Sequence, residues 1–379
     1  MAERMRGGVI KRGSTWSYVV RERDPETGKT KPRWVSGFRT QKEAKEARAD
    51  ALSAMGKGTY VAPRNLTVGE WLDQWIAGHE LELKPSTAAS YRANIERYLK
   101  PAIGHERMQT LSPVRLSVVF RELYETGGKG GKSLSPRTVE FARSVLRRSM
   151  NDAVLGRVVN VNPVTGTKRP RVVKPKHTTW TAAQLHTFLE GSTSWLAALY
   201  TLSAATGMRR GEICALRWED IDLDTGLVRV ERSVTQVAQE RTYGTPKNHE
   251  RRQVTIDART LAVLKAHRKQ QTGQRLAAHG WADDEGLVFT WQDGTPVAPD
   301  YVGKEFDRAQ AGLGLPRLKL HELRHTHATI LLRERVPVHV VAKRLGHKDP
   351  SITLNVYADA IPDDDGQAVD VFARVVHGA

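Results

Sequence analysis

The residues best suited to anion binding and proton transfer gather between positions 320 and 357. The segment His321 to His325 reads His-Glu-Leu-Arg-His. In a helix, residues three and four apart lie on one face, so His321, Arg324 and His325 are expected to project together. Imidazoles exchange protons near neutral pH, and a guanidinium offers a fork of N–H donors that matches two oxygens of a phosphate. The pattern predicts one spot that combines a fixed cation with two imidazoles.

Two further reactive groups follow. Gly346 is placed like the residue that ends a helix, so His347 is expected on the turn beyond it. Tyr357 comes next on a short, separate segment after Pro350. A phenol has a pKa of about 10, so it needs nearby cations to act as a nucleophile.

The same run also fits the helical zinc-protease motif, in which His321 and His325 would bind zinc and Glu322 would be the base. That interpretation gives Arg324 no role, and no third zinc ligand stands out downstream. Cys214 is the single cysteine, so neither an intramolecular disulfide nor a cysteine-rich zinc site can form. We expect Cys214 in the core, and no metal or cofactor.

Taken in order, the motifs resemble the catalytic domain of the tyrosine recombinases, the phage integrase family. The set is Thr206-Gly207-Met208-Arg209-Arg210-Gly211-Glu212, Thr245-Pro246-Lys247, the His-x-x-Arg-His run, Leu345-Gly346-His347 and Tyr357. Each part alone has an ordinary explanation, such as a helix-face pair of Arg209 with Glu212 or a packed tyrosine. The ordered set, across residues 178 to 360, is specific.

The resemblance implies a role for each residue. Tyr357 would attack a DNA phosphate and form a covalent 3′-phosphotyrosine, while Arg209 and Arg324 hold the two non-bridging oxygens. Lys247, on a hairpin, would be the general acid, His321 the base or proton shuttle, and His347 a donor to a phosphate oxygen. Glu212 would orient the Arg209 region. Arg210 and His325 are adjacent alternatives, and only the alignment of the motif favours Arg209 and His321.

Composition points to a polyanionic partner. The 379 residues include 59 Lys and Arg against 42 Asp and Glu, a formal net charge of +17. Nucleic acid is the first candidate for such a surface. No run of about 18 apolar residues is present, and the first residues lack the apolar core of a signal peptide. We therefore expect no membrane contact and a cytoplasmic protein, associated with the nucleoid when bound to DNA.

The length predicts several domains. Residues 1–60 read as a small module with strands around Trp16 and Trp34 and a helix from about Gln41 to Met55, both tryptophans being expected in its core. It resembles the arm-type DNA-binding modules of integrases. The alternative is a small accessory domain with another partner.

Residues 65–162 read as an all-helical domain, which the resemblance identifies as the core-binding domain. Helix starts are predicted at Thr67, Ser86, Ser112 and Ser135, and Pro101 is expected to end the second helix. Residues 163–177 are predicted to be an extended basic linker.

Residues 178–360 are predicted to be a mixed, mainly helical catalytic domain with a small sheet, formed by strands at about 227–230 and 252–256. Residues 361–379 carry an apolar stripe of Val369, Phe372 and Val376 at helical spacing. It either packs on its own domain or docks on a neighbouring protomer. The predicted fold class is therefore multidomain α+β.

The predicted function is that of a site-specific integrase which acts on double-stranded DNA at core and arm sites, as a homotetramer. An excisionase or a host DNA-bending protein is an expected partner. A type IB topoisomerase-like strand transferase is the first alternative, although relaxing supercoils needs no second DNA-binding module. A non-catalytic DNA-binding regulator is the second, although every expected catalytic position holds a competent residue.

Overall fold

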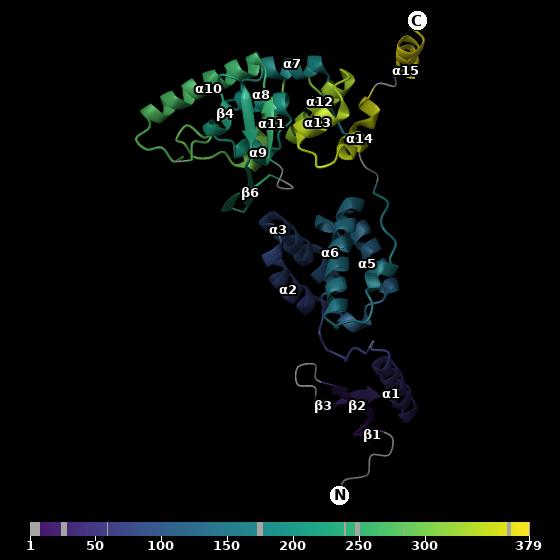
Figure 1. Cartoon of the computed structure of the whole chain (residues 1–379). Coiled ribbons are helices and arrows are strands. Elements are labelled where there is room, and N and C mark those ends of the chain that lie inside the picture. Colours follow the sequence, from purple (N-terminus) through teal and green to yellow (C-terminus); the bar gives the residue numbers. More distant parts are fainter. Residues whose placement is uncertain are drawn as a thin grey trace. The chain divides into compact units, whose positions relative to one another are not determined.

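The computed structural model describes residues 8–23, 29–58, 60–172, 177–238, 240–246, 251–283, 285–361 and 365–378. The chain divides into two compact units, Met1–Val173 and Lys174–Ala379 (Figure 1). The first unit holds a small sheet-plus-helix module followed by a helical bundle, and the second holds a mainly helical domain with small antiparallel sheets. The predicted multidomain α+β fold is confirmed.

The N-terminal module is a three-stranded antiparallel sheet with a helix on one face. Its strands are β1 (Val9–Arg12), β2 (Thr15–Arg23) and β3 (Thr30–Phe38), with β2 in the centre. Helix α1 (Gln41–Gly56) begins at Thr40, whose side chain accepts a hydrogen bond from the Glu43 N–H. Tyr18 and Val20 pack against Ala44 of α1. Strand β1 was not predicted, because four residues give too short a pattern.

The prediction that both tryptophans lie in the core of this module is wrong for Trp34. Trp16 packs with the residues that face α1. Trp34 lies opposite Val19 in the sheet, out of phase with the core residues, and the Arg12 guanidinium sits 4.1 Å from the centre of its ring. Successive side chains of a strand point to opposite faces. Trp34 therefore belongs to the face of the sheet that α1 does not cover.

The helical domain contains α2 (Val68–His79), α3 (Pro85–Asn94), α4 (Lys100–Ile103), α5 (Pro113–Thr126) and α6 (Pro136–Leu155). The predicted caps Thr67, Ser112 and Ser135 each accept a hydrogen bond from the first turn of their helix. Trp75 of α2 donates to the Asp152 carboxylate of α6 at 2.6 Å. Apolar side chains from all of these helices form one core.

Two predictions about the second helix are wrong. Its N-cap is Lys84, since Pro85 occupies the first turn and leaves Ser86 inside the helix. Pro101 does not end it either. A π-helical turn, Ile95–Leu99, precedes Pro101, and the helix continues to Ile103. The proline occupies the first turn of α4, where a missing N–H is tolerated.

The predicted linker begins later than residue 163. Val164 is fully buried in the helical core, on a 3₁₀ turn over Pro163–Gly166. The buried Arg143 guanidinium of α6 donates to the Thr167 hydroxyl and to the carbonyls of Val164 and Thr167. These bonds supply partners for the buried guanidinium and hold residues 163–167 against α6. These residues are therefore part of the helical bundle.

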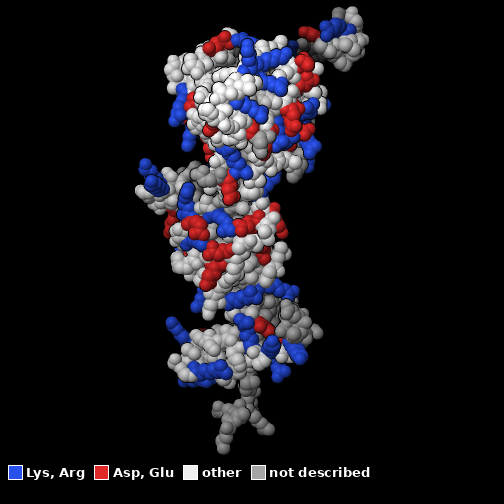
Figure 2. Space-filling model, turned by 90° about the vertical axis from the view of Figure 1, so that its left-hand side faces the viewer, with Lys and Arg blue, Asp and Glu red and all other residues white. Residues whose placement is uncertain are grey.

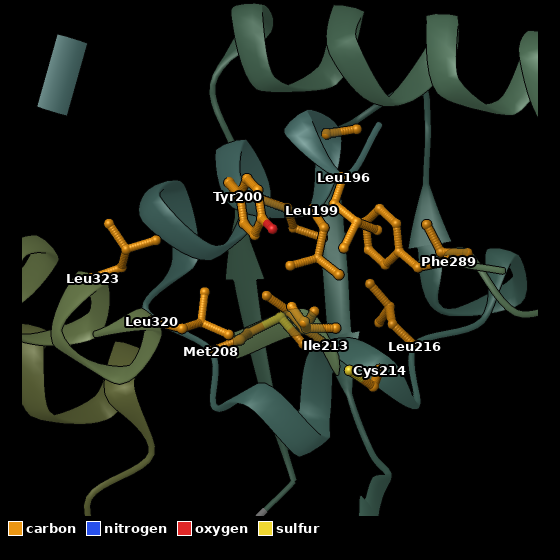
Figure 3. Close-up of a cluster of buried hydrophobic side chains, with 14 of the residues drawn as sticks. Leu196, Leu199, Tyr200, Met208, Ile213, Cys214, Leu216, Phe289, Leu320 and Leu323 are labelled. Carbon is orange, nitrogen blue, oxygen red and sulfur yellow. The ribbon is translucent and has the colours of Figure 1, made fainter. Parts of the chain in front are cut away.

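The second unit is built around a core of buried apolar residues (Figure 3). Its helices include α7 (Ala182–Gly191), α8 (Ala197–Thr206), α9 (Arg210–Cys214), α10 (Ala258–Ala277), α11 (Pro299–Ala309), α12 (Leu320–Arg333), α13 (Val338–Leu345) and α14 (Pro350–Tyr357). Leu199 and Tyr200 of α8 meet Ile213 of α9 and Leu323 of α12 in this core. Cys214 is buried, as predicted.

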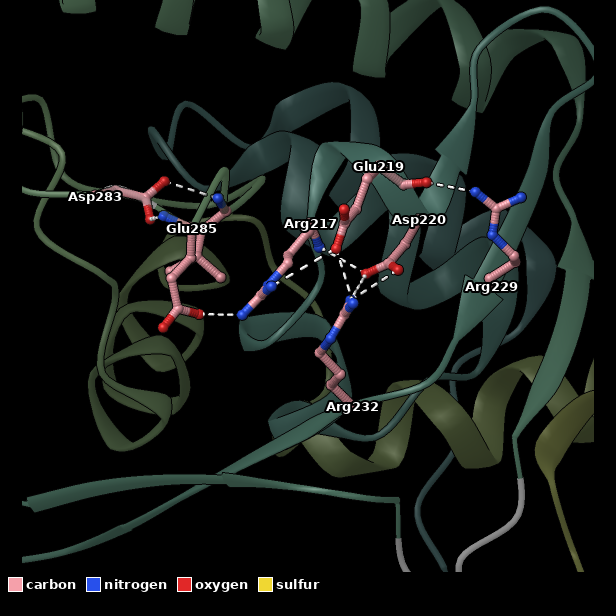
Figure 4. A network of polar contacts seen from close by, with 8 residues as sticks. Arg217, Glu219, Asp220, Arg229, Arg232, Asp283 and Glu285 are labelled. Carbon is pink, nitrogen blue, oxygen red and sulfur yellow. Dashed lines mark hydrogen bonds and ion pairs between the residues drawn. The ribbon is translucent and has the colours of Figure 1, made fainter.

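The described residues of this unit also form two small antiparallel sheets. The first has the order β4 (Ile221–Asp222), β5 (Leu227–Val230), β8 (Arg252–Thr255), and the second is the hairpin of β6 (Ser233–Val237) and β7 (Glu240–Gly244). Ion pairs lie next to the start of this hairpin. Arg232 makes two 2.9 Å bonds to the Asp220 carboxylate, while Arg217 pairs with Glu285 (Figure 4).

The C-terminal segment ends in α15 (Asp365–Phe372) and a π-helical turn, Ala373–His377. Its apolar side chains are exposed, Phe372 at 60% and Val375 at 75%. The interpretation that the stripe packs on its own domain is therefore not realised here. Within the described ranges no helix has both the length and the apolar character that a membrane crossing requires.

Candidate active site

Helix α12 presents the central part of the site. Leu323 and Ala328 are fully buried and fix which way the helix faces. This orientation leaves His321 on the exposed first turn and turns Arg324 and His325 inward, at 3% and 9% exposure. The side chains that the spacing predicted to project together do lie close. The ring centres of His321 and His325 are 5.3 Å apart, and burial followed by the nearby Arg324 charge lowers the pKa of His321.

The Arg324 guanidinium is anchored by two backbone carbonyls. One terminal nitrogen donates to the Gly207 carbonyl and the other to the Leu345 carbonyl, each at 2.7 Å. Burial, together with the nearby Arg209 and Arg252, lowers the pKa of Arg324, but the group stays protonated at neutral pH. The bonds join the turn before α9 to the end of α13 and fix a positive charge between them.

Arg209 is held by a second set of contacts. Its Nη1 donates to the Glu212 carboxylate at 2.8 Å, and its Nη2 donates to the Gly346 carbonyl at 3.3 Å. Glu212 is 1% exposed and also accepts from Arg252 of β8 at 2.7 Å. Burial alone would raise the pKa of Glu212, but Arg252 and Arg209 outweigh it and hold the pKa below its usual range. Glu212, one helical turn past Arg209, therefore fixes the position of the Arg209 guanidinium.

The turn at Gly346 places His347. Gly346 is in the left-handed region at φ 67°, and a side chain there would collide with Arg252, so only glycine fits. The His347 Nδ1 is 2.7 Å from the Thr353 hydroxyl. Burial, and then Arg324 and Arg209, lower the pKa of His347 to about 4. His347 is therefore neutral at physiological pH.

Tyr357 is the last residue of α14 and is 4% exposed. Its ring lies in one hydrophobic cluster with Ala328 and Leu345, and its hydroxyl lies 2.7 Å from Nδ1 of His325. Burial raises the pKa of Tyr357 to about 12, although Arg324 opposes this rise. The nucleophile predicted from the resemblance is therefore a protonated phenol beside a buried guanidinium.

His325, which the sequence left as an alternative to His321, is thus the histidine in contact with Tyr357. A second imidazole that was not singled out, His177, stacks on His325 with ring centres 3.8 Å apart. His177 comes just before the catalytic domain's first helix, and no motif marks it. The contact spans 148 positions, so sequence spacing gives no signal for it.

Lys247, which the resemblance predicts on a β-hairpin before the strand at Arg252, lies outside the described residues. Strand β8, which follows Lys247 in the sequence, is described. Its Arg252 contacts the site, although the sequence motifs assign it no role. Across the described ranges, no group of three or more His, Cys, Asp or Glu side chains is arranged to hold a metal ion.

Beside the site runs a basic groove with a volume of about 820 Å³. We call it the β8–α13 groove, and its cationic lining is Arg229, Arg251, Arg252, Lys343 and Lys348. Glu231 is the acidic residue on its wall. The face of the molecule in Figure 2 shows Lys and Arg over every part, and the N-terminal module there carries few acidic residues. Such surfaces favour a polyanion.

Comparison with known proteins gives the family. Residues 179–363 match the phage integrase family, residues 67–123 the phage integrase N-terminal SAM-like domain, and residues 9–55 the arm DNA-binding domain. The chain belongs to the phage integrase family of tyrosine recombinases. The resemblance stated from the motifs is confirmed, and neither alternative function is favoured.

Similar proteins are found across most of the integrase's length. A "Tyrosine recombinase XerC-like" protein of Caldanaerobacter subterraneus is 28% identical over 88% of this chain and 89% of its own. The ICEBs1 integrase of Bacillus subtilis is 23% identical over 92% and 93%.

Solved integrases share the fold. The Tn1549 transposon integrase in complex with a circular intermediate DNA has a TM-score of 0.68, at 19% identity, over 80% of this chain and 98% of that one. A lambda integrase tetramer bound to a Holliday junction has a TM-score of 0.61, at 17% identity, over 96% and 99%.

Proposed function

We propose that this integrase cleaves and rejoins DNA at specific sites through a covalent bond to Tyr357, and so integrates or excises a mobile element. The observation that best supports this is the convergence of Tyr357, Arg324, Arg209 and His347. They come from four segments of the chain. Arg324 and Arg209 donate to the carbonyls of Leu345 and Gly346, which directly precede His347, and Tyr357 lies in one hydrophobic cluster with Leu345.

The chemistry follows from these groups. The Tyr357 oxygen attacks the scissile phosphorus, the bond to the 5′ oxygen breaks, and a 3′-phosphotyrosine forms. Arg209 and Arg324 neutralise the charge that builds on the non-bridging oxygens. We assign His347 as a further donor, His321 as base or shuttle, and Lys247 as the acid for the leaving oxygen. The covalent bond retains the energy of the phosphodiester, so rejoining needs no ATP.

The remaining parts would bind double-stranded DNA and other copies of the chain. The open face of the N-terminal sheet, with Arg12 and Trp34, suits an arm site, and the bundle of residues 65–162 suits a core site. The exposed stripe around Phe372 would dock on a neighbouring protomer in a homotetramer. An excisionase or a host DNA-bending protein completes the proposed set of partners, at the nucleoid of the cytoplasm.

The decisive experiment uses Tyr357→Phe. A nicked duplex that carries the sequence adjoining the gene should trap a covalent adduct with the intact integrase, because the cleaved fragment diffuses away. The Phe variant should bind this duplex but form no adduct, whereas Tyr124→Phe, at an exposed tyrosine, should form it normally. Denaturing gels measure the adduct. An adduct on the Phe variant would refute the assignment.

A further inference from the structure

We propose that His325 is the catalytic base that takes the proton of Tyr357 during strand cleavage. This inference rests on the proposed function and assigns one of its steps to the residue that the sequence left as an alternative to His321. It leaves His321, on the exposed first turn of α12, to act as a shuttle or at the phosphate.

The geometry singles out His325 among the imidazoles of the site. Its Nδ1 is 2.7 Å from the Tyr357 oxygen, a normal distance for an O–H···N bond. The Nδ1 of His347 is taken up by the Thr353 hydroxyl. His321 stands edge-on to His325, and in the described part of the chain no hydrogen bond joins it to Tyr357. A base must be within hydrogen-bond reach of the proton that it removes.

The protonation states give this bond its direction. The pKa of His325 is lowered to about 3, mainly by burial. Smaller contributions come from four groups around the ring: His177 at the linker end, His321 and Arg324 on α12, and His347 on the turn after α13. The ring is therefore neutral, and burial also keeps Tyr357 protonated. Because the phenol carries the proton, the hydroxyl donates and Nδ1 accepts.

DNA would supply what the free protein lacks for proton transfer. A scissile phosphate between Arg209 and Arg324 brings negative charge near the ring, and negative charge raises the proton affinity of an imidazole. As the Tyr357 oxygen bonds to phosphorus, its proton passes to Nδ1 and the bond from phosphorus to the 5′ oxygen breaks. The 5′ oxygen takes a proton from the general acid, and rejoining reverses each transfer.

The stacked His177 keeps the ring in place. Its ring lies at 16° to that of His325, so it covers one face and leaves the edge with Nδ1 directed at Tyr357. His177 is exposed, which makes it the outer layer of the stack. A ring held between a stacked neighbour and a hydrogen bond has little freedom to turn away from the nucleophile.

The test compares His325→Ala and His325→Gln with the intact integrase on the nicked duplex defined above. Single-turnover adduct formation should fall about 10²- to 10⁴-fold at neutral pH in both variants, the usual contribution of a general base. Gln keeps a polar group near the hydroxyl but cannot take a proton. Between about pH 7 and pH 9 the variant rates should rise about tenfold per pH unit as hydroxide replaces the base, while the intact chain rises less.

His186→Ala, at an exposed imidazole of α7, is the matched control and should cleave normally. Binding of the same duplex and thermal unfolding are measured for each variant, so that a folding defect is recognised. Near-normal cleavage by His325→Gln would reduce His325 to a positioning residue and overturn the proposal, as would a variant pH profile parallel to that of the intact chain. Failure of the intact integrase to form an adduct would instead refute the proposed function.

Discussion

At the scale of single residues, the site holds more arginine side chains than carboxylates that could pair with them. Arg209, Arg252 and Arg324 surround one carboxylate, that of Glu212. Placing like charges together destabilises a fold unless a ligand of opposite charge is bound. The arrangement is that of a site prepared for a phosphate, and its neutral histidines add donors and acceptors without adding charge.

Arg324→Lys tests the forked contact. The Lys ammonium keeps the charge but cannot reach the Gly207 and Leu345 carbonyls and a phosphate together. Cleavage of the nicked duplex should slow by about 10² to 10³, as for the loss of one preorganised donor. Arg333→Lys, at the exposed end of the same helix, should cleave normally. If Arg324→Lys cleaves at the normal rate, Arg324 is not at the phosphate.

At the scale of elements, strand β8 joins the two halves of the site. Arg252 donates to Glu212, next to α9, and to the Arg344 carbonyl, at the end of α13. Its Nη1 is buried beneath Gly346 and has no hydrogen-bond partner among the described residues. A buried polar atom left unsatisfied is costly, whereas the bonds to Glu212 and to the Arg344 carbonyl fix the positions of α9 and α13 relative to β8.

Arg252→Met is therefore expected to destabilise the catalytic domain. Removing Arg252 leaves the buried Glu212 carboxylate with Arg209 as its remaining cationic partner among the described residues, and breaking a buried ion pair typically costs about 3–5 kcal/mol. Urea unfolding should show a loss of this size, and the double variant with Glu212→Gln should recover part of it. Arg251→Met, at the exposed neighbouring position, is the control. Equal stability of the Arg251 and Arg252 variants would show that the buried pair contributes little.

Local signals predicted most of these elements and few of the contacts between them. Caps such as Thr67 and Ser135 mark a helix start by a hydrogen bond within four residues, which sequence can show. The π turn that carries the chain past Pro101 depends on tertiary packing, and the contact of His325 with Tyr357 depends on how α12 meets α14. Spacing within one helix says nothing about such a meeting.

At the scale of the whole molecule, the modules divide the work of binding and chemistry. Every residue assigned to the chemistry lies between positions 177 and 357. The N-terminal module has a small core of its own, and its sheet has an open face with Arg12 and Trp34. The N-terminal module can therefore be removed without touching the catalytic groups.

A chain that begins at Asn65 is expected to form the Tyr357 adduct at a core site yet fail in complete recombination, since it cannot bridge an arm site. The isolated module should bind duplex DNA with an affinity that falls as salt rises, because its cations release counterions from phosphates. Recombination of a plasmid with both kinds of site measures the first effect. Full recombination by the shortened chain, at the rate of the intact one, would disprove the bridging role.

The anchoring of Arg324 by two carbonyls of its own chain has a thermodynamic consequence. A free arginine side chain loses rotamer entropy when it grips a ligand, at about 0.5–1.5 kcal/mol for each side chain immobilised. Here the order is imposed when the protein folds, because the Gly207 and Leu345 carbonyls already hold both terminal nitrogens. The loss of rotamer entropy therefore lowers the free energy of unfolding of the domain and does not weaken the binding of DNA.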